Sequence, residues 1–140
     1  MKNKKTSSAL AEQRDQLSQY RGLLRRVQAG KLELARLTGQ LLRLSPFTKR
    51  EAKGRAREIL RMRKNLLGEL ARCEELLAAL EKYIGEIEDC ELRRIFTLRY
   101  IHAYPWRRIA FAIGKYEESY PRKRHDRYIE KCIEEGKDLL

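Results

Sequence analysis

A chain of 140 residues is long enough for one compact domain or for a small domain with an extended arm, and it leaves little room for a deep catalytic pocket. Lys and Arg number 32 against 20 Asp and Glu, which gives a formal charge of +12 at pH 7. This excess favours a polyanionic partner, namely DNA, RNA or an anionic membrane surface, over a charge that serves solubility alone.

The sequence lacks the patterns that accompany metals, catalysis and membranes. Cys73, Cys90 and Cys132 are widely spaced without a C-x-x-C pair, so we expect three reduced core thiols. His125 and Asp126 are adjacent, and neighbouring helical residues point about 100° apart, so we expect no catalytic pair there. We find no phosphate loop, dinucleotide fingerprint or long apolar stretch. The expectation is a cytoplasmic protein that is not an enzyme and has no cofactor, metal or membrane partner.

Residues 1–87 predict two long helices that form an antiparallel hairpin. Thr48 and Glu51 form a capping box, which places the start of the second helix near Thr48, just after the joint at Pro46. Apolar residues recur at intervals of three and four along the second helix, and the first helix has the same spacing with Gln13 and Lys31 at two of its seam positions. The first seam is Leu10, Leu17, Tyr20, Leu24, Val27, Leu34, Leu37, Leu41 and Leu44, and the second is Ile59, Met62, Leu66, Leu70, Cys73, Leu77, Leu80, Ile84 and Ile87. The alternative is that these seams pair between chains in a homo-oligomer.

Strongly basic segments flank Pro46. The cations are Arg43, Lys49, Arg50, Lys53, Arg55, Arg57, Arg61, Arg63 and Lys64. They form either a solvated helix face or a second nucleic-acid contact. A helix lying on a membrane surface is disfavoured, because Phe47 is the only aromatic residue of this segment.

Residues 88–140 predict a compact unit of three helices. Asp89 suits the N-cap of the first helix, and a corner follows at residues 102–104. Pro105 suits the first position of the next helix, Gly114 suits a left-handed C-cap, and Ser119 suits the N-cap of the last helix. Together with the first 87 residues, this gives an all-α fold.

The last helix has an apolar side and a cationic side. A helix of this kind fits the major groove of duplex DNA, while cations at the start of the preceding helix can hold phosphates. The candidate DNA-binding residues are Arg107, Arg108, Ser119, Tyr120, Arg122, Lys123, Arg124, Arg127 and Lys131.

The stretches LRYIHAYPWRRIAFAIG and SYPRKRHDRYIEK carry a family resemblance. The first resembles the helix-turn-helix of the fourth region of bacterial sigma factors. Together, over residues 84–131, they resemble phage-encoded regulators of the RinA and ArpU type. The resemblance implies a coiled-coil N-terminal segment and late-gene transcription control in the nucleoid, with double-stranded DNA and RNA polymerase as partners. The chain departs from the pattern where Ala103 and Tyr104 replace a Gly-containing turn and Pro105 replaces a Ser or Thr cap.

Two other classes of binding protein compete with a transcriptional regulator. A small terminase-like DNA-packaging subunit also joins a helix-turn-helix to a helical assembly region, and it differs in forming a ring of many copies. A helical RNA-binding protein is less consistent with the sequence, because aromatic platforms for base stacking are absent.

Overall fold

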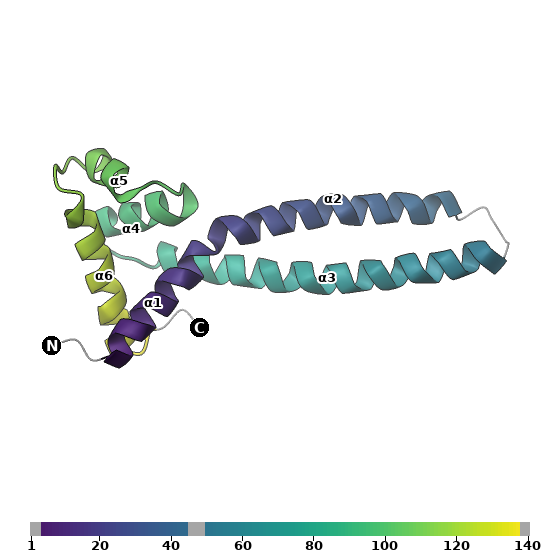
Figure 1. The fold of residues 1–140 in the computed structure, drawn as a ribbon, viewed down its shortest axis with the longest axis horizontal. Helices are drawn as coiled ribbons and strands as arrows, with labels where there is room; N and C mark the ends of the chain where they lie inside the picture. Colours follow the sequence, from purple (N-terminus) through teal and green to yellow (C-terminus); the bar gives the residue numbers. More distant parts are fainter. Residues whose placement is uncertain (1–3, 45–49, 138–140) are drawn as a thin grey trace. The chain divides into compact units, whose positions relative to one another are not determined.

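The computed structural model describes residues 4–44 and 50–137, and within these ranges it is all-helical, as predicted. No strand occurs in either range. The start near Thr48 and the joint at Pro46 lie outside the described residues. The elements are α1 (Lys4–Ser18), α2 (Tyr20–Leu44), α3 (Arg50–Gly85), α4 (Cys90–Phe96), the π-helical turn η1 (Thr97–Ile101), α5 (Trp106–Ala112) and α6 (Ser119–Glu134) (Figure 1).

The chain divides into two compact units. Residues 1–21 and 78–140 form one unit, here called the head, and residues 22–77 form the other, called the arm. This division differs from the expected one at residues 87 and 88, because α1 packs against α6. Leu10 and Leu17 of α1 are buried, and Tyr20 donates a hydrogen bond of 2.9 Å to Glu81. The N-terminal helix therefore belongs to the core of the head.

The first predicted helix is interrupted at Gln19. The Ser18 hydroxyl donates to the carbonyl of Arg14 at 2.7 Å, and the Gln19 amide donates to the carbonyl of Gln16 at 3.2 Å. A serine that bonds back to the preceding turn and a tighter amide bond both bend a helix. The seam expected on one helix from Leu10 to Leu44 is therefore divided between α1 and α2.

In the arm, α2 and α3 lie side by side and run in opposite directions (Figure 1). Gly30 faces Leu70, whereas Leu44 shares a shallow hollow with Arg55, so numbers rise along α2 as they fall along α3. The buried seam of the arm is Leu23, Val27, Leu37, Ile59, Leu70 and Leu77. The prediction was wrong for two seam positions, since Leu24 is 38% exposed and Met62 is 43% exposed.

Two glycines of α2 provide a matched test of this packing. A Cβ atom at Gly30 would overlap the side chain of Leu70, whereas a Cβ atom at Gly39 would meet nothing within 4 Å. We expect Gly39→Ala to stabilise the arm by about 1 kcal/mol, because alanine is the better helix former. Gly30→Ala should gain less or lose stability, and thermal unfolding followed by circular dichroism compares the two. Equal stabilisation by both substitutions would contradict the contact of Gly30 with Leu70.

In the head, aromatic rings surround Phe96, which is fully buried. Its ring centroid lies 4.6 Å from that of His125, 5.5 Å from Tyr128, 5.9 Å from Tyr100 and 6.3 Å from Tyr83. These residues come from α3, α4, η1 and α6. The cluster thus joins α6 to the three consecutive elements α3, α4 and η1.

The predicted caps of the head are confirmed at two positions. Asp89 accepts from the Leu92 amide at 3.0 Å, and Gly114 has a φ of 78°. Pro105 holds the N-cap position of α5, one residue before the expected place. Ser119 is the first residue of α6 and Glu118 takes the cap position without a side-chain hydrogen bond, so the predicted Ser119 cap is wrong.

The corner between η1 and α5 depends on Ala103, whose φ of 55° lies in the left-handed region. Glycine adopts this region without the steric cost that a Cβ atom brings. The turn is therefore built although the sequence lacks the Gly expected there.

The three cysteines differ in their exposure to solvent. All three cysteines are free, but only Cys132 is buried; Cys73 is half-buried and Cys90 is exposed, so the prediction of three core thiols was wrong for Cys90. Among the described residues, no helix is both long and apolar enough to span a bilayer.

Candidate nucleic-acid interface

Helix α6 has a buried side and a cationic side, as the sequence predicted. Its buried residues are Pro121, His125, Ile129 and Cys132. On other sides of the helix the exposed cations are Arg122, Lys123, Arg127 and Lys131. The spacing of four residues between Lys123, Arg127 and Lys131 aligns these three side chains along one stripe of the helix. The packing of α6 in the head thus leaves this stripe open to solvent.

Arg124 and Tyr120, predicted to face DNA, instead bind acidic residues at the start of α4. Arg124 donates to Glu91 at 2.6 Å and to Asp89 at 2.8 Å. The Tyr120 hydroxyl donates to Glu91 at 2.7 Å. Both side chains are half-buried, so they hold α6 against α4 in this structure. The prediction used Asp89 only as an N-cap and gave Glu91 no role, so it missed both partners of Arg124.

The charges of this cluster stabilise one another. The Leu92 amide and then Arg124 lower the pKa of Asp89, while Tyr120 and then Arg124 lower the pKa of Glu91. Hydrogen bonds to Asp89 and Glu91 raise the pKa of Arg124. Since each carboxylate is favoured in its ionised form, the cluster contributes stability at neutral pH that is lost as both acids protonate.

Arg107 and Arg108 are exposed at the start of α5, where the sequence placed the phosphate anchors. The Arg108 guanidinium lies 3.8 Å from the ring centroid of Tyr104. The guanidinium of Arg99 lies 4.4 Å from the Trp106 ring and donates to the Tyr104 carbonyl at 3.2 Å. Cation–π contacts of this kind restrict a long side chain without neutralising it. Arg108 is therefore held in place while keeping its charge available.

Lys115 is a cation near α6 that the prediction missed. It is exposed in the turn after Gly114, and its Nζ lies 4.9 Å from the Tyr120 ring centroid. The sequence signal that could have identified Lys115 was its position, between the predicted C-cap at Gly114 and the first turn of α6. Ser119, at the start of α6, is half-buried.

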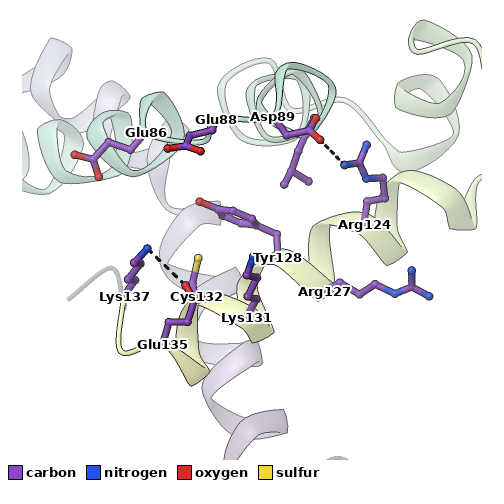
Figure 2. Close-up of a pocket in the computed structure, with 11 residues that line it drawn as sticks. Glu86, Glu88, Asp89, Arg124, Arg127, Tyr128, Lys131, Cys132, Glu135 and Lys137 are labelled. Carbon is purple, nitrogen blue, oxygen red and sulfur yellow. Dashed lines mark hydrogen bonds and ion pairs between the residues drawn. The ribbon is translucent and has the colours of Figure 1, made fainter.

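A hollow of about 540 Å³ lies beside the cationic stripe, between α6 and the segment that joins α3 to α4. Figure 2 shows Glu86, Glu88 and Asp89 on one side, and Lys131 on α6 across from them. Arg127 extends away from Glu86 and Glu88 (Figure 2). The acids that line the hollow are Glu86, Glu88, Asp89 and Glu135, and the cations are Arg124, Arg127, Lys131 and Lys137, so its lining carries no excess of either charge.

His125 lies in the core of the head, and its side chain is fully buried. Its Nδ1 lies 2.9 Å from Oδ1 of Asp126, and its Nε2 hydrogen-bonds with the Tyr100 hydroxyl. The expectation that His125 and Asp126 cannot pair was therefore wrong, since side-chain rotation closes the gap between neighbours. A ring that donates to a carboxylate and accepts from a hydroxyl is satisfied in its neutral form. Enclosed in this way, the ring is out of reach of a substrate.

We expect His125 to make the stability of the head depend on pH. Burial lowers the pKa of His125, and the hydrogen bond to Asp126 opposes that shift only in part. Arg14, Arg99 and Tyr100 are the other titratable groups nearby. The unfolded chain then binds a proton more readily than the folded one, so stability holds above the ordinary histidine pKa of about 6.5 and falls as pH drops below it.

The two histidines of the chain allow a matched measurement. His125→Gln should weaken the pH dependence of the melting temperature between about pH 5 and 7, whereas His102→Gln, at an exposed position, should leave it unchanged. The same pH dependence in all three proteins would exclude His125 as its source.

Comparison with known proteins assigns the chain to no family. No family model matches the chain. No curated protein and no solved structure matches it either. Among the described residues, no group of three or more His, Cys, Asp or Glu side chains is arranged to hold a metal ion. The candidate interface therefore depends on the exposed cations of α5 and α6.

Proposed function

We propose that the head binds double-stranded DNA and that the protein is a transcriptional regulator of the phage or prophage type. In this proposal α5, the turn at residues 113–118 and α6 form a helix-turn-helix, and α6 enters the major groove. The resemblance to the fourth region of sigma factors suggests RNA polymerase as a second partner.

One observation carries the proposal: the buried stripe of α6 leaves Lys123, Arg127 and Lys131 exposed in a line, with Arg107 and Arg108 exposed on the adjacent α5. Cations on a groove-sized helix can reach guanine edges or phosphates, and cations on the preceding helix can hold the backbone. The formal charge of +12 adds a general attraction to a polyanion.

The structure changes the expected role of Arg124. Because this side chain binds Asp89 and Glu91, its removal should destabilise the packing of α6 on α4, by on the order of 1 kcal/mol for charge-assisted hydrogen bonds. We therefore base the DNA test on Lys123 and Arg127, whose side chains are exposed.

The test compares Lys123→Ala/Arg127→Ala with Arg57→Ala/Arg61→Ala, a pair of exposed cations on α3. Both double variants remove the same charge. If DNA binding were a purely general electrostatic attraction, the two variants would therefore lose the same affinity. We expect the α6 pair to lose affinity for duplex DNA and to lower the salt dependence by about two units, measured by fluorescence anisotropy at several salt concentrations. If the α3 pair loses affinity and the α6 pair does not, the basic segment of the arm is the DNA site instead.

The sequence preference of DNA binding distinguishes residues that contact bases from residues that contact phosphates. Selection of bound fragments from random duplex DNA would first define a consensus. Removal of a cation of α6 that contacts bases should weaken DNA binding by about 1–3 kcal/mol and relax that consensus. Arg107→Ala should instead weaken binding to all DNA sequences alike. Absence of any consensus would contradict sequence-specific regulation.

A further inference from the structure

Besides Leu32, four leucines of the arm are substantially exposed although their helices are already paired. Leu24 and Leu42 on α2 are 38% and 68% exposed, and Leu60 and Leu67 on α3 are 47% and 46% exposed. The buried seam between α2 and α3 leaves these side chains uncovered. Several large apolar side chains gathered on one face indicate a contact surface, whereas scattered ones do not.

The four leucines share one face of the arm. Leu24 and Lys31 are seven residues apart, and Leu42 follows eleven residues later, so the three lie along one stripe of α2. Leu60, Leu67 and Glu74 are each seven residues apart and lie along one stripe of α3. The ion pair between Lys31 and Glu74, at 3.9 Å, joins the two stripes. Both stripes therefore border the same side of the helix pair.

The stripe of α3 is self-complementary when it is reversed. It begins one heptad before Leu60, at the exposed Lys53, and so runs Lys53, Leu60, Leu67, Glu74. Two copies of this stripe can lie antiparallel, related by a two-fold axis between residues 63 and 64. Each Leu60 then meets Leu67 of the other copy, and each Lys53 meets Glu74 of the other copy. A two-fold interface requires this property, because the same patch must contact itself. A parallel pairing would place lysine against lysine and glutamate against glutamate.

The wider charge pattern of α3 favours the same orientation. Residues 50–64 contain seven Lys or Arg and two Glu, an excess of five cations. Residues 65–77 contain three Glu and one Arg, an excess of two acids. An antiparallel arrangement places each basic segment beside an acidic one and separates the two basic ends.

We propose that the protein forms an antiparallel homodimer through this face of the arm. The occupant of the face is a second copy of the chain, packed along α3 with Leu24 and Leu42 of α2 at its border. The result is a four-helix arrangement in which a heptad stripe forms the seam. This dimer uses a different surface from the seam of Leu66, Leu70 and Leu77, which packs within the chain. It is independent of DNA binding.

The mass of the full chain in solution tests the dimer directly. Light scattering or sedimentation should give twice the 16.6 kDa of one chain. Leu60→Gln/Leu67→Gln should give a monomer with unchanged helix content, whereas Leu32→Gln, at a 75% exposed leucine one residue from the Lys31 stripe, should remain a dimer. A wild-type monomer, a ring of many copies, or a dimer that survives the double substitution would each overturn the proposal.

A charge exchange tests the antiparallel register. The Lys53→Glu substitution places a second carboxylate opposite Glu74 at each end of the seam. The repulsion should raise the dissociation constant of the dimer about tenfold. Lys53→Glu/Glu74→Lys restores opposite charges in the antiparallel register and should recover the dimer. Lys31→Ala, which removes only the intrachain ion pair of Glu74, is the control and should leave the mass unchanged. Failure of the double exchange to recover the dimer would overturn the register.

Discussion

Phe96→Ala is expected to destabilise the head by about 3–5 kcal/mol. The Phe96 side chain is fully buried and lies among the rings of Tyr83, Tyr100, His125 and Tyr128. Its removal forfeits the burial of a large ring and leaves a cavity that four elements border. The loss is large relative to the usual stability of a small domain, so the variant head should be partly unfolded at physiological temperature.

Phe111→Ala is the matched control, because Phe111 on α5 is 85% exposed and its removal should change stability by no more than about 0.5 kcal/mol. Urea unfolding followed by the fluorescence of Trp106, the only tryptophan, reports on the head specifically. Similar losses from the two substitutions would show that the ring cluster does not hold the head together.

Leu17→Ala should also lower the stability of the head, by about 2–5 kcal/mol, although it lies far from α6 in the sequence. Leu17 is fully buried, and its helix α1 packs against α6. If α1 instead belonged with the arm, as the sequence suggested, the change would leave the unfolding of the head unaffected. The fluorescence of Trp106 therefore distinguishes the two divisions of the chain.

Leu32→Ala controls for the substitution itself. Leu32 lies on α2 and is 75% exposed, so little apolar surface is lost when it is shortened. Alanine is an excellent helix former, and we expect a change within about 0.5 kcal/mol. A loss at Leu32 comparable to that at Leu17 would mean that the exposed leucine has a packing partner in solution.

Local signals in the sequence predicted the helices and several of their ends. The periodic seam located α3, and the caps at Asp89 and Gly114 form as their residue types require. The break at Gln19 escaped prediction, because it depends on one serine bonding back to the preceding turn. Periodicity reports which face of a helix is apolar, and it carries no information on which distant helix will cover that face.

The same limit applies to the candidate interface. Helical spacing placed Lys123 and Arg127 on an exposed stripe correctly, because burial of the opposite side fixes their direction. It failed for Arg124 and for the pairing of His125 with Asp126, because these contacts are set by side chains of other elements or by rotamer choice. A pairing such as that of Arg124 with Glu91 spans 33 positions and leaves no periodic trace in either segment.

The packing of α1 on α6 also constrains the order in which the chain acquires structure. During synthesis α1 emerges before α6, so Leu10 and Leu17 remain without their native cover until α6 has been made. The contacts within the arm are more local, and its antiparallel pairing shortens the loop that separates residue 21 from residue 78. We therefore expect the arm to form early and the head to close late, in the step that brings α1 onto α6.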